Sequence, residues 1–181
     1  MIENTTKFID LSVGLKWDDM RAPASTINPI GPVAPPSVDT EDGGLLFGKG
    51  EAVAIWFQIP HGWKEGTALY PHLHWTKVSA GTGLPNWRYR YKIAAPGETF
   101  GAVSAWISGS EGLTNDDIVG KHAIWTFPPL DMTGRTLSTM LGIRLERTND
   151  ANDTYSGDAK LLEFDIHYQI DAPGSKLPFD K

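Results

Sequence analysis

Apolar and polar residues alternate one by one along two long stretches, and this alternation constrains the fold more than any other feature of the chain. In NWRYRYKIAA, residues 86–95, aromatic and aliphatic side chains alternate with two arginines and a lysine. In LLEFDIHYQI, residues 161–170, positions 162 to 170 alternate in the same way between large apolar and polar side chains. Because successive side chains of a β-strand point to opposite faces, both stretches are predicted to be strands with one buried face.

Further strands are predicted from the same alternation in shorter or weaker form. They lie at residues 45–48, 51–60, 69–78, 103–108, 122–127 and 139–148. The segments between them are rich in Gly, Pro, Asn and Asp, which are the residues that favour turns. About eight short strands joined by such turns predict an all-β fold, an antiparallel two-sheet sandwich of jelly-roll type, over residues 45–181.

The first 44 residues lack the clear alternation seen in the rest of the chain. Five prolines lie between residues 21 and 44, without a periodic apolar pattern, and proline cannot donate to a sheet ladder. Before them, apolar residues between Phe8 and Trp17 could form a short edge strand. We therefore predict that residues 1–44 form an extended Pro-rich N-terminal arm, which leans on the surface of its own domain or of a neighbour.

Composition excludes several classes of function. The chain has 181 residues, of which 40% are hydrophobic, and this length suits one core. Cysteine is absent, so disulfides, thiol nucleophiles and cysteine-based zinc sites are excluded. The formal net charge is −6 and the basic residues are scattered, which argues against a nucleic-acid partner. No apolar run is long enough to span a membrane and the first residues lack the zones of a signal peptide, so we expect synthesis in a cytoplasm.

Two histidines, His72 and His74, lie one position apart on a predicted strand, and both point away from the core if Leu73 and Trp75 point inward. His167, Glu163 or Asp165 could add a metal ligand if the last strand pairs beside this one. The pair resembles the His-x-His of cupins, but HLHWTKVSAG lacks the carboxylate that the cupin pattern requires next. Histidines that hydrogen-bond across strands are therefore the favoured interpretation: no metal and no cofactor are predicted, and a cupin-like metal-binding enzyme using His72, His74 and His167 remains an alternative.

Other chemistry has little support in the sequence. Phosphate-binding, dinucleotide-binding and nucleophile-elbow motifs are absent, and the acidic pairs are of the kind found on any solvated surface. No catalytic residue is therefore predicted. Aromatic side chains exposed on a sandwich could stack on sugars, which keeps a carbohydrate- or receptor-binding tail module as a further alternative. The candidates for such a platform are Trp63, Trp106 and Trp125.

Four segments resemble a family of small tailed-bacteriophage proteins encoded among virion structural genes. They are KWDDMRAP, IPHGWKEGTALYPHLHW, GKHAIWTFPPLDMTGRTLSTMLGIRLER and DTYSGDAKLLEFDIHYQIDAPGSK. The resemblance runs from about Trp17 to Lys176 and implies a jelly-roll-like accessory part of a virion, without transferring any catalytic residue.

A non-enzymatic phage structural protein is thus the leading hypothesis: a capsid-decorating (cement) protein or a head–tail or tail accessory subunit. It would be made in the host cytoplasm, reside in the virion and contact other virion proteins and itself as a trimer or dimer. Tryptophan beside charges that can pair is typical of binding hot spots. The predicted interface anchors are therefore Trp17, Asp18, Asp19 and Arg21.

Overall fold

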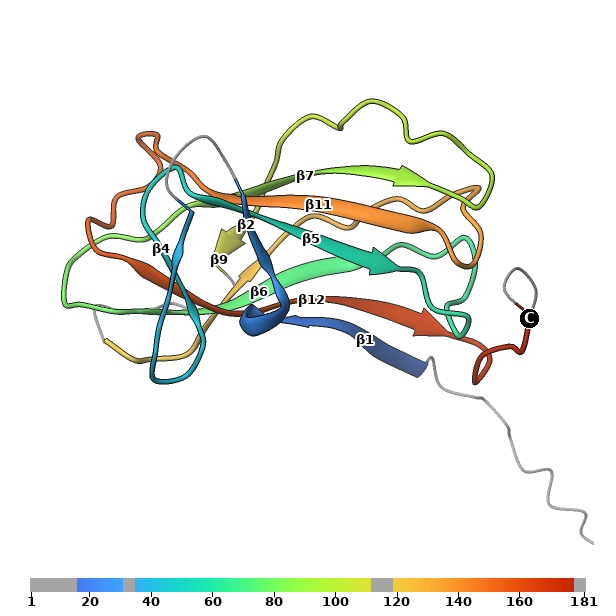
Figure 1. The fold of residues 1–181 in the computed structure, drawn as a ribbon, viewed down its shortest axis with the longest axis horizontal. Helices are drawn as coiled ribbons and strands as arrows, with labels where there is room; N and C mark the ends of the chain where they lie inside the picture. Colours follow the sequence, from blue (N-terminus) through green and yellow to red (C-terminus); the bar gives the residue numbers. More distant parts are fainter. Residues whose placement is uncertain (1–15, 31–34, 112–118, 178–181) are drawn as a thin grey trace, which may run out of the picture.

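The computed structural model describes residues 16–30, 35–111 and 119–177, and it shows an all-β sandwich of two antiparallel sheets of jelly-roll type (Figure 1). The predicted fold class is therefore confirmed. The strands are β1 (Lys16–Pro23), β2 (Asn28–Ile30), β3 (Ser37–Val38), β4 (Leu45–Phe47), β5 (Ala52–Gln58), β6 (Tyr70–Lys77), β7 (Trp87–Ala94), β8 (Ile107–Ser108), β9 (Ser110–Glu111), β10 (Ala123–Thr126), β11 (Met140–Arg147) and β12 (Ala159–Ile170). A 3-10 turn, η1 (Ala24–Thr26), follows β1.

The two sheets have different sizes. The seven-stranded sheet runs in the order β3-β4-β12-β6-β10-β9, and β1 pairs with β12 on the same side as β4. The five-stranded sheet has the order β2-β5-β11-β7-β8. The predicted strand at residues 103–108 shrinks to Ile107 and Ser108 in β8. Each sheet therefore has one inner face, toward the other sheet, and one outer face toward solvent.

The core lies between the inner faces. Trp75 of β6 and Trp87 of β7 are fully buried there, and Phe47 meets the edge of Trp87 with ring centroids 5.0 Å apart. These are the residues that the alternation predicts to point inward. The cations at positions 88, 90 and 92 of β7 lie on the outer face, as the same pattern requires.

β12 contains a β-bulge at Leu162, and the bulge corrects one detail of the sequence prediction. Strict alternation places Leu162 inward, but the register shifts between Leu161 and Glu163, so Leu161 is buried and Leu162 is half-buried. A bulge adds one residue to a strand and changes which face the following side chains occupy. Beyond the bulge, Phe164 faces the core and the polar residues 163, 165 and 167 face outward.

The N-terminal segment is built into both sheets. β1 pairs with β12 along its whole length, and β2 pairs with β5 of the other sheet (Figure 1). Met20 and Ala22 of β1 are buried in the core. The boundary that the sequence predicts between an arm, residues 1–44, and a domain, residues 45–181, is thus not a boundary between separate units in the described residues. Pro23 ends β1 and Pro29 lies in the edge strand β2, positions at which a sheet tolerates proline.

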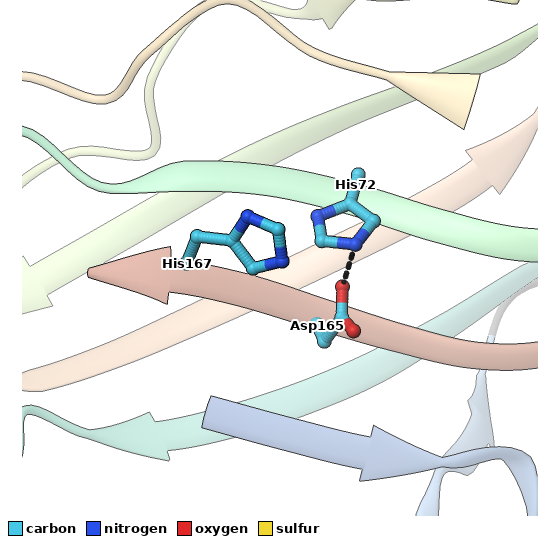
Figure 2. Close-up of side chains that lie close together, drawn as sticks. All are labelled: His72, Asp165 and His167. Atoms are coloured by element: carbon cyan, nitrogen blue, oxygen red, sulfur yellow. Dashed lines mark ion pairs between the residues drawn. The ribbon is translucent and has the colours of Figure 1, made fainter. Parts of the chain in front are cut away.

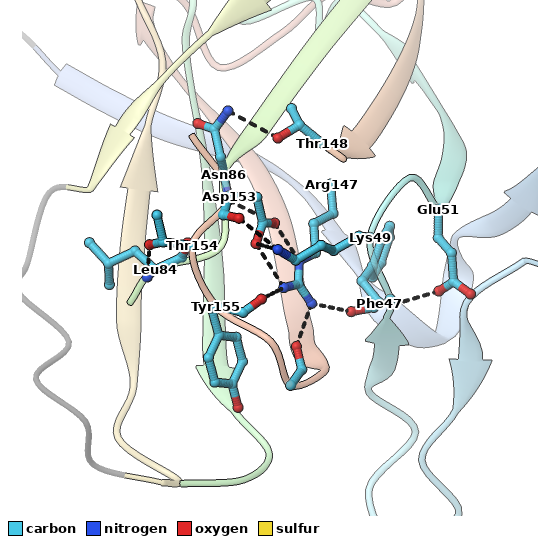
Figure 3. Close-up of polar contacts among 12 residues, drawn as sticks. Phe47, Lys49, Glu51, Leu84, Asn86, Arg147, Thr148, Asp153, Thr154 and Tyr155 are labelled. Atoms are coloured by element: carbon cyan, nitrogen blue, oxygen red, sulfur yellow. Dashed lines mark hydrogen bonds and ion pairs between the residues drawn. The ribbon is translucent and has the colours of Figure 1, made fainter. Parts of the chain in front are cut away.

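A buried ion pair fixes the long loop between β11 and β12 (Figure 3). Arg147 donates from Nε and Nη2 to the two carboxylate oxygens of Asp153, at 2.7 and 3.0 Å. The same guanidinium donates to the backbone carbonyls of Phe47, Tyr155 and Gly157. An Asx turn within NDANDTYSGD, in which Asp150 accepts a hydrogen bond from the backbone N–H of Asn152, also shapes the loop.

Candidate functional site: a histidine and carboxylate cluster

The outer face of the seven-stranded sheet gathers histidines and carboxylates from neighbouring strands. β6 and β12 are adjacent and antiparallel, with His72 opposite Asp165 and His74 opposite Glu163. The condition set by the sequence, that the last strand pairs beside the His-x-His strand, is therefore met. Leu73 and Trp75 are fully buried, so the two histidines point outward as predicted.

Asp165 lies at the centre of this cluster and is only 5% exposed. Its Oδ1 atom is 2.5 Å from Nε2 of His72 (Figure 2). Its Oδ2 atom is 3.4 Å from Nε2 of His74. The close contact at Oδ1 stabilises the protonated form of the His72 ring. A buried carboxylate is costly unless it is paired, and here its close partners are imidazole rings.

Two further histidines complete the cluster. The ring of His167 meets the edge of the His72 ring, with centroids 4.4 Å apart (Figure 2). His122, just before β10, has Nε2 at 2.7 Å from Nδ1 of His74. The remaining histidine of the chain, His61, lies apart and contacts the hydroxyls of Ser138 and Ser175.

The pKa values of the two β6 histidines move in opposite directions. Burial lowers the pKa of His72, but the contact with Asp165 and its negative charge outweigh burial, so the pKa is raised overall. Burial also lowers the pKa of His74, and the positive charges that His72 and His122 can carry lower it further against the opposing effect of Asp165. The cluster therefore favours at most one protonated ring of this pair beside the carboxylate.

The arrangement brings metal-ligating atoms together. One atom each from His72, Asp165 and His167 forms a set whose members all lie within 4.8 Å of one another. The set opens into a depression of about 600 Å³, which Asp19, Arg21, His122 and Glu163 also line. The sequence named His72, His74 and His167 as candidates; the structure brings all three together, but the set that can share one ion contains Asp165 in place of His74. His122 was missed, because only the pairing of β10 with β6 places it there.

The predicted interface anchors lie on β1, and each contacts its own chain. Arg21 donates to both carboxylate oxygens of Glu163 at 2.7 Å. Asp18 accepts a hydrogen bond from the Tyr168 hydroxyl. Asp19 lies 3.1 Å from Nε2 of His167. Trp17 is 46% exposed and packs edge-on against Tyr70, with ring centroids 5.4 Å apart. Their role as an interface stays a prediction, and Asp19 and Arg21 additionally border the histidine cluster.

The tryptophan platform predicted for sugar binding does not form as expected. Trp63 is fully buried and Trp125 is 6% exposed, so both belong to the core. Trp106 is half-buried, and the guanidinium groups of Arg88 and Arg90 lie over its ring at 4.3 and 4.7 Å. Trp63 and Trp125 were wrong candidates for an exposed platform. The alternation of residues along one strand does not show which aromatic side chains are buried when the two sheets pack together.

Fold and site together define a β-sandwich with a histidine and carboxylate cluster on one outer face. No family model matches the chain and no curated protein matches it. Among solved structures, the chain is similar to the CBM36-1 domain of a multidomain xylanase from the hindgut metagenome of Trinervitermes trinervoides, with 14% identity, a TM-score of 0.48, and 87% of this chain and 100% of that chain covered. It is also similar to dimeric latent PorU from Porphyromonas gingivalis, with 14% identity, a TM-score of 0.39, and 87% and 13% covered.

These likenesses are confined to sandwich architecture, and neither protein's ligand or activity carries over to this chain. Among the described residues, no helix is long and apolar enough to cross a membrane.

Proposed function

We propose that the protein is a non-enzymatic structural subunit of a bacteriophage particle, a capsid-decorating protein or a head–tail or tail accessory subunit, that works through protein–protein contacts. The sequence resemblance from Trp17 to Lys176 supports this assignment, and a β-sandwich with a solvent-facing outer surface on each sheet suits it. The subunit is made in the host cytoplasm and resides in the virion as a homo-oligomer. The observation that carries the proposal is an aromatic and cationic surface on the five-stranded sheet.

This surface is centred on Trp56 of β5, which is 47% exposed. Trp56 and Lys92 both lie opposite Gly142 of β11 in the strand register. A Cβ atom at position 142 would come within 2.7 Å of the Trp56 ring, so the glycine lets the indole lie across β11. Phe100 packs edge-on against Trp56 at 5.6 Å. A shallow depression of about 240 Å³, which Val103 also lines, adjoins the indole.

Cations surround the aromatic centre. Arg90, Lys92 and Arg144 line the same depression, although the chain as a whole has 22 acidic and 16 basic residues. The guanidinium of Arg144 also donates from Nη2 to Glu146 at 3.3 Å, which holds it beside the depression. Tryptophan and arginine at the centre of a patch are typical of binding hot spots.

The occupant that we propose is a second copy of this chain, whose net charge of −6 complements the cationic surface. A contact between this surface and a different, acidic part of the next copy is head-to-tail, and it closes into a ring when the rotation between copies allows. The smallest such ring is a trimer, one of the two states, trimer or dimer, expected from the sequence. Charge complementarity of this kind depends on salt, because these half-buried cations are still in contact with solvent.

A sugar-binding role has less support on the same surface. The ammonium group of Lys92 lies over the Trp56 ring at 5.3 Å, and two arginines lie over Trp106. Sugars stack on open indole faces, whereas these faces are partly covered by cations of the same chain. Protein carboxylates can engage such cations directly, which favours a protein partner.

Light scattering after size exclusion tests the proposal, with wild type compared with Trp56→Ala and Lys92→Glu at low and high salt. We expect an oligomer for wild type and monomers for both variants. The urea midpoint should be unchanged in Lys92→Glu and slightly lower in Trp56→Ala, because the indole packs on Phe100 and β11. Trp17→Ala is the matched control: it removes an equally exposed tryptophan from the opposite outer face and should leave the oligomer intact.

A wild type that stays monomeric at about 100 µM would overturn the assembly proposal. An oligomer lost only in Trp17→Ala would instead place the contact on β1, as the sequence predicts. It would overturn the assignment of the contact to the surface around Trp56. Removing residues 1–40 is not a suitable test, because β1, β2 and β3 would go with them.

A further inference from the structure

We propose that His72, Asp165 and His167 bind one divalent ion of the zinc class, on the outer face of the seven-stranded sheet. The site is independent of the assembly surface, which lies on the other sheet. Two imidazole nitrogens and one carboxylate oxygen are a donor set that zinc uses in proteins, with the fourth position left to water. The ligands come from β6 and β12, and Asp19 brings β1 beside them.

The geometry needs only a small adjustment to hold the ion. Zinc ligands at bond lengths of about 2.1 Å lie about 3.4 Å from one another in a tetrahedron, and the three ligand atoms here are all within 4.8 Å. His72 and Asp165 are already in contact (Figure 2). The side chain of His167 is 49% exposed, so its ring can turn toward the other two without disturbing the core.

The charge of the site also favours a cation. Asp165 is 5% exposed, and its two nearest partners are the imidazole rings of His72 and His74. Neither ring carries the permanent charge of an arginine. A carboxylate in such surroundings lacks a permanent counter-charge, unlike one paired with arginine. A divalent ion between Asp165 and the two rings would supply that charge and accept the nitrogen lone pairs.

Surrounding residues are placed to orient the ligands. Asp19 lies 3.1 Å from Nε2 of His167, and carboxylates beside metal-binding histidines commonly fix the ring and raise its basicity. Glu163 is engaged by both nitrogens of the Arg21 fork and is therefore held away from the ion. Asp19 is in this view a positioning residue. The bound ion would cross-link β6 to β12 and, through Asp19, restrain the edge strand β1.

The test uses full-length protein without a polyhistidine tag, freed of metal by dialysis against EDTA. Zn²⁺ titration by calorimetry should give one ion per chain, and Zn²⁺ should raise the melting temperature by several degrees, whereas equal Mg²⁺ should not. Co²⁺ as a probe should give the intense visible absorption of a four-coordinate site. His72→Gln and His167→Gln should each weaken Zn²⁺ binding by about 100-fold or more, and Asp19→Asn by about tenfold.

His61→Gln is the matched control, because it removes a histidine outside the cluster, and it should bind Zn²⁺ as wild type does. Absence of saturable binding at micromolar Zn²⁺, or unchanged binding in both His72→Gln and His167→Gln, would overturn the proposal. It would show that the cluster is a hydrogen-bonded histidine network only. If His72→Gln fails to fold, as judged by circular dichroism, His167→Gln decides the question alone, because the exposed His167 ring is not needed for the core.

Discussion

Asp153 and Asp165 are both buried aspartates, 3% and 5% exposed, but they are paired in different ways. Asp153 accepts two hydrogen bonds from Arg147 and one from the backbone N–H of Asn86, and Lys49 lies 3.3 Å away (Figure 3). Asp165 meets the rings of His72 and His74. One carboxylate has a permanent cation and the other has partners whose charge depends on protonation.

This difference separates a structural pair from a candidate site. Arginine stays protonated at any ordinary pH, and three carbonyls use the remaining donors of Arg147, so the Asp153 cluster is saturated. Nothing further is needed there and no ligand can enter. The Asp165 cluster opens into a depression, and its imidazole nitrogens can bind a proton or a metal ion. Binding of either would stabilise the cluster further.

The largest expected effect comes from breaking the saturated cluster. Arg147→Met should lower the free energy of unfolding by about 3–5 kcal/mol, because it leaves Asp153 and several carbonyls buried without their partner. Urea denaturation followed by tryptophan fluorescence measures this. Arg147→Met combined with Asp153→Leu should recover part of the loss, since the unpaired charge is then gone. A loss below about 1 kcal/mol in the single variant would contradict the structural role.

A smaller loss of stability is expected when the buried carboxylate of the histidine cluster is replaced. Asp165→Asn should cost about 1 kcal/mol in metal-free protein, because the His72 ring, unlike a guanidinium, can lose its proton and hydrogen-bond the amide as a neutral imidazole. Asp153→Asn, its matched counterpart, should cost about 3 kcal/mol or more, because it unpairs a buried guanidinium. Equal losses in the two variants would mean that Asp165 also belongs to a structural ion pair, with His72 permanently protonated.

Much of the fold was predictable because alternation is a local signal. β7 and the part of β12 that follows the bulge keep this alternation residue by residue. Arg88 and His167 therefore lie on the outer faces, as expected. The bulge at Leu162 was not predictable, since it depends on how β12 meets β6 and β4. The edge strand predicted between Phe8 and Trp17 lies mostly outside the described residues, whereas β1 runs from Lys16 to Pro23. Its later half was not predicted, because a strand rich in charges and ending in proline resembles a loop until its partner is known.

The site was predictable only in part. His72 and His74 stand out because they are two residues apart, and the last strand was named as the source of a third ligand. Which of its polar residues turns toward His72 depends on register, and the register selects Asp165 over Glu163. His122 and Asp19 come from β-strand neighbours that are distant in sequence, so no spacing rule links them to the histidine pair.

The smallest effect is expected at a third carboxylate cluster, which is partly exposed. Lys160 donates to Asp39 and Asp42, at 2.8 Å each. These hydrogen bonds, aided by the backbone N–H groups of Glu41 and Gly44, lower the pKa of both carboxyls. A depressed carboxyl pKa in the folded state stabilises the fold above the unfolded value of about 4, and this contribution is lost as the pH falls below it.

Lys160→Gln should therefore lower the urea midpoint slightly at pH 7, and the gap to wild type should close below about pH 3. Urea midpoints at pH 7, 4 and 3 check this. Asp131 is a useful comparison, because hydrogen bonds from Thr133, and no cation, lower its pKa. The contribution of Asp131 to the acid dependence of stability should therefore remain in Lys160→Gln and decrease in Thr133→Val. A gap that stays constant from pH 7 to 3 would show that Lys160 acts through the packing of its stem on Gly44 and not through its charge.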